Sequence, residues 1–326
     1  MAIRIKDVAR VAGVSPATVS RVLTGRLVNP AMVEAVNAAV AQTGYRPNLI
    51  ARRLRSRHNG TIGLIVADIR NPFFTAVSRK VEEIAFANDL RVILCNTDED
   101  HEKEMMHLRM MQDERVAGVI IAPSLEGVEV VGRAEFDFPV VLFDRAPIRR
   151  VHDAVVLDNE AASAMLVHHL HGKGFRRISA LLGGSTTGHE RLVGYRDAML
   201  SLGLEPDPHV VPHDGGDPQA MLADLMRASP PPEAIIGSDG VILLELVRAS
   251  IAMGLRVPED LTLAGFDNNP WTEVFAGGMT VVEQPVDNIG QVAMEMLLAR
   301  LEEPGAPVRK TVLSGSLVLR DAAPGA

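Results

Sequence analysis

The spacing of apolar residues predicts that the chain begins with a small helical unit. Three short helices are expected in the first 46 residues, at 6–12, from Pro16 onward and over 30–43. Gly13 ends the first helix, because glycine adopts the left-handed turn conformation without steric cost. Proline is tolerated at the first position of a helix, where its missing N–H loses nothing. The pattern therefore predicts an all-α unit.

From Thr61 onward, short continuous apolar runs alternate with helical segments. A first series contains TIGLIVADI and RVILCNTD, and a second contains RRISALLGG and LTLAGFDN. Such strands occur in parallel sheets that helices cover on both faces. The two series predict an α/β core of two doubly wound parallel-sheet subdomains. Ligands bind such sheets beyond the C-terminal ends of their strands, so a ligand cleft is expected between the subdomains.

A basic segment at 47–59 connects these two regions. Asn48 is placed to cap a helix there, and Leu54 lies among four arginines. The segment has too little apolar surface to form a stable helix alone in water. It is therefore predicted to be a hinge that becomes helical only against a partner.

The distribution of charge changes the meaning of the overall net charge of −8. Residues 1–60 contain ten Lys or Arg and two acidic residues, which gives a net charge of +8. The remainder contains 23 Lys or Arg and 39 acidic residues, which gives a net charge of −16. Dense positive charge binds phosphates by releasing counterions, whereas an acidic region is repelled by DNA. The two regions are therefore expected to have different partners.

The N-terminal helices also have the pattern of a helix-turn-helix. Ala9 is small where two helices cross closely, Gly13 makes the turn, and Val19 packs the second helix onto the first. The start of the second helix enters the major groove in this motif. Arg21 is the best candidate base reader, because its guanidinium can bind O6 and N7 of guanine.

At these residues the chain resembles the lac repressor family, which includes the purine, galactose and ribose repressors. The resemblance covers nearly the whole chain. It rests on IKDVARVAGVSPATVSRVL, GYRPNLIARRLRS, NPFF, LFDR, GSTTGHERLVGYRDAM, SDG, GFDNNPW and VVEQP. It implies a sequence-specific transcriptional repressor, not an enzyme, that forms a homodimer on palindromic double-stranded operator DNA. A small molecule bound between two core subdomains, as in periplasmic sugar-binding proteins, is expected to control operator affinity.

The resemblance also implies the domain boundaries. They are 1–46 for the helix-turn-helix domain, 47–59 for the hinge and 60–326 for the effector-binding and dimerisation core. Within the core, the N-subdomain is expected at about 60–158 and 286–314, and the C-subdomain at about 159–285 and 315–326.

The DNA contacts expected from the motif and the resemblance come from the second helix, the following loop and the hinge. Leu54 is the apolar wedge that partly unstacks a base step in the minor groove. The loop TGRLVNPAMVEAV is shorter than in the family and lacks its usual Thr-Arg pair, so Arg26 is expected to substitute. The predicted DNA-binding residues are Ser15, Pro16, Ala17, Thr18, Ser20, Arg21, Arg26, Asn48, Ala51, Leu54 and Arg55.

The expected effector contacts lie on loops at strand ends. Carboxylates, amides and an arginine around aromatic rings suit a polyhydroxylated ligand, a sugar or sugar acid. A purine or nucleoside corepressor is the alternative. Arg191 and Asp267 are the strongest candidates, since an unpaired charge in a cleft is costly without a bound partner. The predicted effector-binding residues are Phe73, Phe74, Asp144, Ser185, Thr187, Arg191, Ser238, Asp267, Trp271 and Gln284.

Other readings have weaker support. The loop at Gly183 lacks a dinucleotide or phosphate-loop fingerprint, which argues against a nucleotide enzyme. His168 and His171 lack a nearby carboxylate partner, so neither a metal nor a cofactor is expected. A secreted solute-binding protein would need a signal peptide, whereas the N-terminus is charged and no apolar run could span a membrane. The protein is therefore expected to be cytoplasmic. A dimer is expected and not a tetramer, since no leucine heptads that would form a tetramer follow the core.

Overall fold

The structure is a computed structural model that describes residues 5–23, 29–43, 60–149, 151–212 and 216–320. The chain forms two compact units, residues 1–59 and 60–326. No helix in the described ranges combines the length and the apolar character needed to span a membrane.

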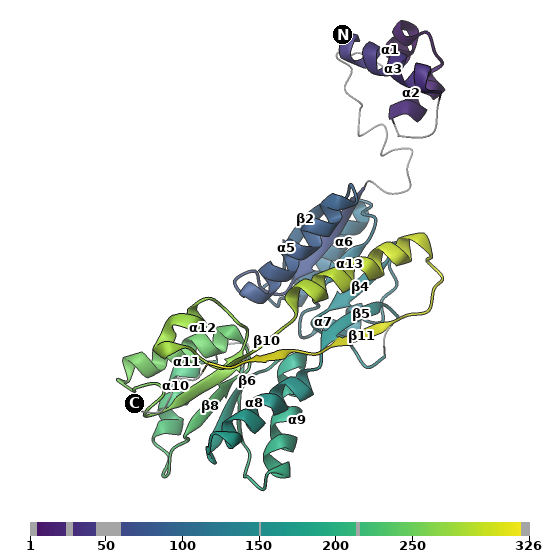
Figure 1. Ribbon diagram of the computed structural model, residues 1–326. Helices are drawn as coiled ribbons and strands as arrows, with labels where there is room; N and C mark the ends of the chain where they lie inside the picture. Colours follow the sequence, from purple (N-terminus) through teal and green to yellow (C-terminus); the bar gives the residue numbers. More distant parts are fainter. Residues whose placement is uncertain (1–4, 24–28, 44–59, 150, 213–215, 321–326) are drawn as a thin grey trace. The chain divides into compact units, whose positions relative to one another are not determined.

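The N-terminal unit contains the three predicted helices, α1 (Ile5–Ala12), α2 (Pro16–Leu23) and α3 (Pro30–Thr43) (Figure 1). Their apolar faces meet in one small core. Its buried residues are Val8, Ala9, Val19, Val36 and Ala39. The helix-turn-helix predicted from Ala9, Gly13 and Val19 is thus present.

Local hydrogen bonds explain where these helices begin. The Ser15 hydroxyl accepts a hydrogen bond from the backbone N–H of Thr18 at 3.1 Å, before α2. The Asn29 side chain accepts one from the N–H of Ala31 at 3.0 Å, before α3. Gly13 has φ of +65°, a conformation that glycine adopts without strain. The turn at Gly13 therefore acts as the sequence predicted.

The first sheet of the core is parallel throughout and has the strand order β11-β5-β4-β3-β1-β2. Helices α5 and α13 cover one face, with α6 and α7 on the other (Figure 1). The strands are β1 (Thr61–Val66), β2 (Arg91–Asn96), β3 (Val119–Ile121), β4 (Val140–Phe143), β5 (Asp153–Leu157) and β11 (Lys310–Leu313). The helices are α5 (Pro72–Ala87), α6 (His101–Asp113), α7 (Gly127–Val131) and α13 (Val286–Glu302).

The second sheet has the order β12-β10-β9-β8-β6-β7 and is parallel except for β12, which runs antiparallel to β10. Helices α8 and α9 cover one face, and α10 and α11 the other. The strands are β6 (Ile178–Gly183), β7 (Asp207–Val211), β8 (Ala234–Gly237), β9 (Thr262–Phe266), β10 (Val281–Glu283) and β12 (Ser316–Val318). The helices are α8 (Asn159–Gly172), α9 (Thr186–Ser201), α10 (Pro218–Met226), α11 (Gly240–Ala252), α12 (Trp271–Val274) and the 3₁₀ turn η1 (Phe275–Gly277).

The chain passes from one sheet to the other after β5, after β10 and after β11 (Figure 1). Each sheet is therefore completed by a segment distant in sequence. This arrangement confirms the predicted core of two doubly wound sheets, and it brings loops from both to one cleft.

Candidate functional site

An inner cavity of about 70 Å³ lies where loops at the C-terminal ends of strands from both sheets meet. The first sheet contributes the segment after β1, with Phe73 and Phe74, and Asp144 after β4. The second sheet contributes segments after β6, β8, β9 and β10. The predicted effector-binding residues that line this cavity are Phe73, Phe74, Asp144, Ser185, Thr187, Arg191, Ser238, Asp267 and Gln284.

A larger cavity of about 310 Å³ adjoins it. The residues that line both are Asn71, Phe74, Arg145, Ser185 and Asp239. The two cavities are therefore compartments of one cleft. The outer compartment is also lined by apolar side chains, among them Leu125, Val211 and Ile242.

Arg191 is one of two buried arginines that line the inner cavity, the other being Arg145. The Nε of Arg191 donates a hydrogen bond to Asn159 Oδ1 at 2.8 Å, and its Nη1 donates to the carbonyl of Ser238. The guanidinium lies 3.8 Å from the ring centroid of Phe266, a cation–π contact. Burial lowers the pKa of Arg191 and nearby carboxylates oppose this, but an arginine stays charged in proteins. Among the described residues its Nη2 donates no hydrogen bond, so that nitrogen can serve a ligand.

Asp267 faces Arg191 from the end of β9. Its two carboxylate oxygens accept hydrogen bonds from the N–H of Gly240, at 2.9 Å, and from Gln284 Nε2, at 2.7 Å. Burial raises its pKa, and Arg191 opposes that shift. The Oε1 atom of Gln284 is buried and has no hydrogen-bond partner among the described residues. It is therefore an acceptor that a ligand hydroxyl can satisfy.

Asp144 approaches from the first sheet in a left-handed conformation, with φ of +64°. Burial raises its pKa to about 6, against the influence of Arg145 and Arg191. One carboxylate oxygen lies 3.2 Å from Arg145 Nε. Both sheets thus place a carboxylate near the same arginine, which makes the inner cavity a site that a single small ligand can bridge.

Several polar residues at the cleft also have a structural role. Asn71, Ser185 and Asp239 are the N-caps of α5, α9 and α11. The Ser185 hydroxyl also lies 2.8 Å from that of Thr187.

Trp271 is the predicted effector contact that the structure does not bring to the cavity. It begins α12 and packs, half-buried, against the apolar core between the second sheet and α11. Its large ring is used in that core.

In the N-terminal unit, the predicted DNA contacts at the start of α2 lie on the surface. Ser15, Pro16, Ala17 and Arg21 are exposed, and Thr18 is half-buried. The other predicted contacts lie outside the described residues: Arg26, Asn48, Ala51, Leu54, Arg55 and the side chain of Ser20.

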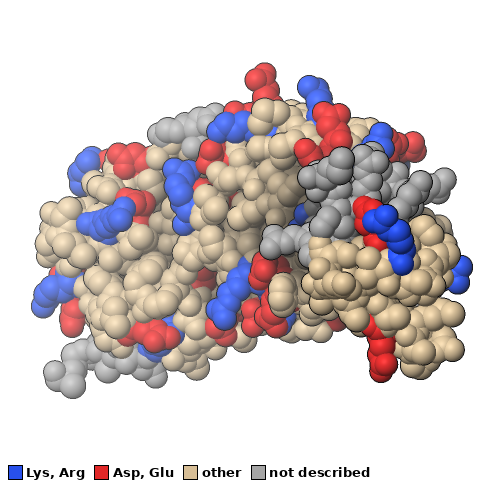
Figure 2. Space-filling view, turned by 90° about the horizontal axis from the view of Figure 1, so that it is seen from above, with Lys and Arg blue, Asp and Glu red and all other residues tan. Residues whose placement is uncertain are grey.

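Figure 2 shows one face of the molecule, on which acidic and basic side chains are interspersed.

Comparisons with known proteins cover both units. Residues 4–48 match the family of bacterial regulatory proteins called lacI, and 167–322 match the periplasmic binding protein-like domain. The regulator PtxS of Pseudomonas plecoglossicida is 32% identical over 99% of this chain and 96% of its own. The ribose operon repressor of Halalkalibacterium halodurans is 31% identical over 98% and 97%. The solved complex of the transcriptional regulator CelR with cellobiose is 26% identical, with a TM-score of 0.71 over 98% of this chain and 100% of that one.

The chain belongs to the lacI family of bacterial regulatory proteins. As a lacI-family protein it is a DNA-binding transcriptional repressor with an effector-binding domain, and its relatives are regulators, not enzymes. This confirms the family, the fold class and the class of function expected from the sequence.

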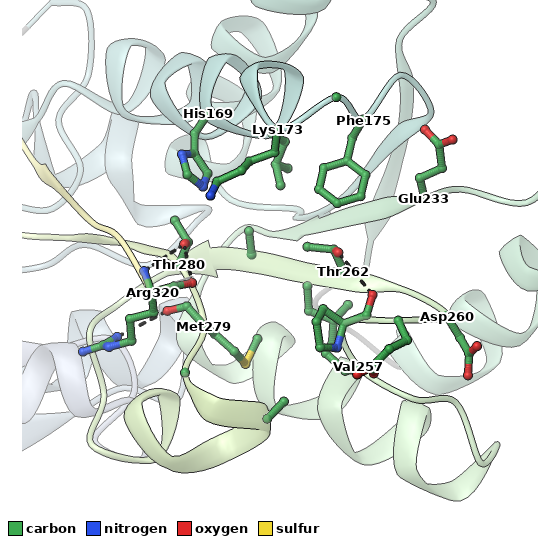
Figure 3. Close-up of a pocket in the computed structure, with 18 residues that line it drawn as sticks. His169, Lys173, Phe175, Glu233, Val257, Asp260, Thr262, Met279, Thr280 and Arg320 are labelled. Carbon is green, nitrogen blue, oxygen red and sulfur yellow. Dashed lines mark hydrogen bonds between the residues drawn. The ribbon is translucent and has the colours of Figure 1, made fainter. Parts of the chain in front are cut away.

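The lacI-family core also has a groove of about 410 Å³ away from the cleft, between the end of α8, strand β9 and the segment that leads into β10 (Figure 3). Several charged residues that line it are paired within the protein. Glu233 pairs with Arg177, Asp260 with Arg256, and Arg320 with Glu273. The groove is lined by the second sheet and its helices alone, so a ligand there would not bridge the two sheets.

Sequence reasoning missed two polar residues that support the cleft. Asn159 positions Arg191, and Glu99 binds Arg145. Neither lies in a motif that identified the family. Within the described residues, no group of His, Cys, Asp and Glu side chains is arranged to hold a metal ion.

Proposed function

We propose that this repressor's affinity for operator DNA is controlled by a small polyhydroxylated molecule, a sugar or sugar acid, bound in the inner cavity of the cleft. The observation that carries the proposal is the convergence of Asp144 from the first sheet with Arg191 and Asp267 from the second. The predicted effector-binding residues that line this cavity are its proposed contacts.

The chemistry of the lining suits a carbohydrate. Asp144, Asp267 and Gln284 Oε1 can accept hydrogen bonds from ligand hydroxyls, and Arg191 Nη2 can donate to them. The rings of Phe73 and Phe74 offer an apolar surface on the other side. The solved CelR relative binds cellobiose, which supports this class of effector.

A ligand held by both sheets can change their relative orientation. It shifts that equilibrium only by its differential affinity for the two arrangements, and typical couplings of about 1 to 3 kcal/mol change operator affinity roughly 5- to 150-fold. We place the helix-turn-helix domain at 1–46 and the hinge at 47–59, directly before β1 of the first sheet. We propose that the effector is an inducer, because a repressor of sugar use should release DNA when the sugar is present.

We propose that the repressor acts as a homodimer on a palindromic operator. Strand β2 is an edge strand of the first sheet and exposes Leu94, and α6 exposes Met106 and Met110. Exposed apolar side chains on an edge strand are costly unless a partner covers them. Two-fold symmetry of the protein would match the symmetry of a palindromic site.

A thermal-shift screen of sugars, sugar acids, polyols and nucleosides tests the effector class. A ligand that binds only the folded protein raises its melting temperature. We expect a carbohydrate to raise the melting temperature of the parent protein but not of Arg191→Ala. A screen in which only nucleosides or purines act would overturn the carbohydrate proposal.

A further inference from the structure

A second arginine of the cleft, Arg145, is bound to a carboxylate that no motif identified. Its Nη1 and Nη2 donate to the two carboxylate oxygens of Glu99, at 2.7 and 2.6 Å. The two side chains are only 7% and 10% exposed. This bidentate geometry is the strongest form of arginine–carboxylate pairing.

The Glu99–Arg145 pair also connects three loops of the first sheet, those that follow β2, β3 and β4. Glu99 follows β2 and accepts a hydrogen bond from the N–H of Leu125 at 3.1 Å. Arg145 follows β4 and donates from Nη1 to the carbonyl of Pro123 at 3.2 Å. Both terminal nitrogens of Arg145 thus have partners within the protein, and turning one toward a ligand would break a buried salt bridge.

Acidic side chains outnumber arginines around the two compartments of the cleft. An anionic ligand would meet this excess of negative charge in surroundings where charges interact more strongly than in water. Burial beside Glu99 and Asp267 contributes to a raised pKa at Asp144, which is consistent with such an excess. Asp68 and Glu245 pair with Arg70 and Arg248, which do not line the cleft; the other acidic residues are Glu99, Asp144, Asp239 and Asp267, and the arginines are Arg145 and Arg191.

We propose that Glu99 is a specificity-determining residue: by neutralising Arg145, it makes the cleft select an uncharged carbohydrate and reject sugar carboxylates and sugar phosphates. This inference rests on the proposed function and decides between the two ligand classes that the function leaves open. Glu99 acts through Arg145, so it is a positioning residue and not itself a contact of the ligand. Arg191 remains the cation available to hydroxyls.

The test uses matched pairs of ligands that differ in one charge: ribose and ribonate, glucose and gluconate, cellobiose and cellobionate. Their dissociation constants are measured by calorimetry with the full-length parent and with Glu99→Gln. The parent should bind the uncharged member of a pair roughly tenfold or more tightly than the acid. Glu99→Gln should bind the acid roughly tenfold better than the parent does, since a carboxylate can then pair with Arg145.

Two further variants separate release of Arg145 from a general change of charge. Glu245→Gln removes one negative charge from the outer compartment, where Glu245 pairs with Arg248, and should change acid binding less than threefold or so. Adding Arg145→Met to Glu99→Gln should restore the preference for the uncharged member, because the released cation is gone.

The outcomes separate the two proposals. A parent protein that binds the acid of each pair more tightly than the neutral sugar would overturn the role of Glu99 and leave the carbohydrate function standing. Equal effects of Glu99→Gln and Glu245→Gln would also overturn it. A parent that binds none of the six compounds would contradict the proposed function, and with it the selectivity.

Discussion

The two sheets of the core have the same architecture but hold charge at the cleft in different ways. The first sheet satisfies Arg145 with a bidentate carboxylate and adds two aromatic rings. The second sheet holds Arg191 with an amide oxygen, a carbonyl and a ring face, and leaves its Nη2 without a protein partner among the described residues.

The two sheets therefore make different contributions to ligand binding. The second sheet supplies the strongest hydrogen-bond donor to a ligand, whereas the first supplies apolar surface and the carboxylate of Asp144. A bound ligand would join two unlike surfaces, so it would be sensitive to their relative orientation. Changing one sheet at a time should separate the two contributions.

The charge on the first sheet should appear in the pH dependence of stability. Burial raises the pKa of Asp144 in the folded protein from 3.8 to about 6. Arg145 and Arg191 oppose this shift, whereas Glu99 and Asp267 add to it. A raised acid pKa means that the folded state binds more protons than the unfolded state between these values. The contribution of Asp144 to stability is therefore full below about pH 4, and about 3 kcal/mol is lost as pH rises through 6.

Asp144→Asn removes this titration. Urea unfolding at pH 4.5 and 7 should show that the variant loses less unfolding free energy than the parent over this interval. The difference between the two proteins is the quantity of interest, because carboxylates with lowered pKa, such as Asp260, act in the opposite direction. If the unfolding free energies of the two proteins changed equally between pH 4.5 and 7, burial would not raise the pKa of Asp144.

On the second sheet, Arg191→Ala should weaken effector binding about 100-fold, because hydrogen bonds to charged groups contribute most. Calorimetric titration with the compound found in the thermal screen measures this loss. Arg196 lies exposed on the same helix, so Arg196→Ala is the matched control and should bind like the parent. Comparable losses in both variants would show that α9 contributes general charge and not a specific contact.

Close packing at the start of α9 sets the position of Arg191. A Cβ at Gly188 would lie 1.8 Å from the carbonyl oxygen of Gly183 in β6. Gly188→Ala should therefore lower the unfolding free energy by about 1 to 3 kcal/mol, measured by urea denaturation. Gly172→Ala is the control, since nothing lies within 4 Å of its Cβ position, and it should be neutral or slightly stabilising.

The aromatic surface of the first sheet should matter less for binding than Arg191. Phe74 is buried and meets Phe143 edge to face, with centroids 6.1 Å apart. Phe74→Leu keeps an apolar side chain there, so effector affinity should fall roughly tenfold at most. A loss of effector affinity larger than that of Arg191→Ala, in the same calorimetric assay, would contradict the smaller role proposed for the aromatic surface.

Much of this arrangement was predictable because its signals are local. Ser15 and Pro16 mark a helix start by themselves, and Arg191 and Asp267 lie in recognisable motifs that follow strands. Trp271 also lies in such a motif, but the sequence does not show whether a ring beside a strand end faces the cleft or the core. Only the packing around α12 decides it.

The role of Glu99 could not be predicted for a different reason. Its partner lies 46 positions away, and the two meet only because β2 and β4 end at the same edge of one sheet. In the run TDED it is one acidic residue among several. A pairing that depends on two loops after non-adjacent strands leaves no periodic or spacing signal in the chain.

The central claim is that a ligand bridging the two sheets controls DNA binding. Fluorescence anisotropy of a labelled operator, selected with the parent protein, tests it most directly when the effector from the thermal screen is added. The parent should lose operator affinity by roughly 5- to 150-fold, and Arg191→Ala should bind the operator as the parent does and stay bound. An unchanged operator affinity in the parent, or a full response in Arg191→Ala, would contradict the account.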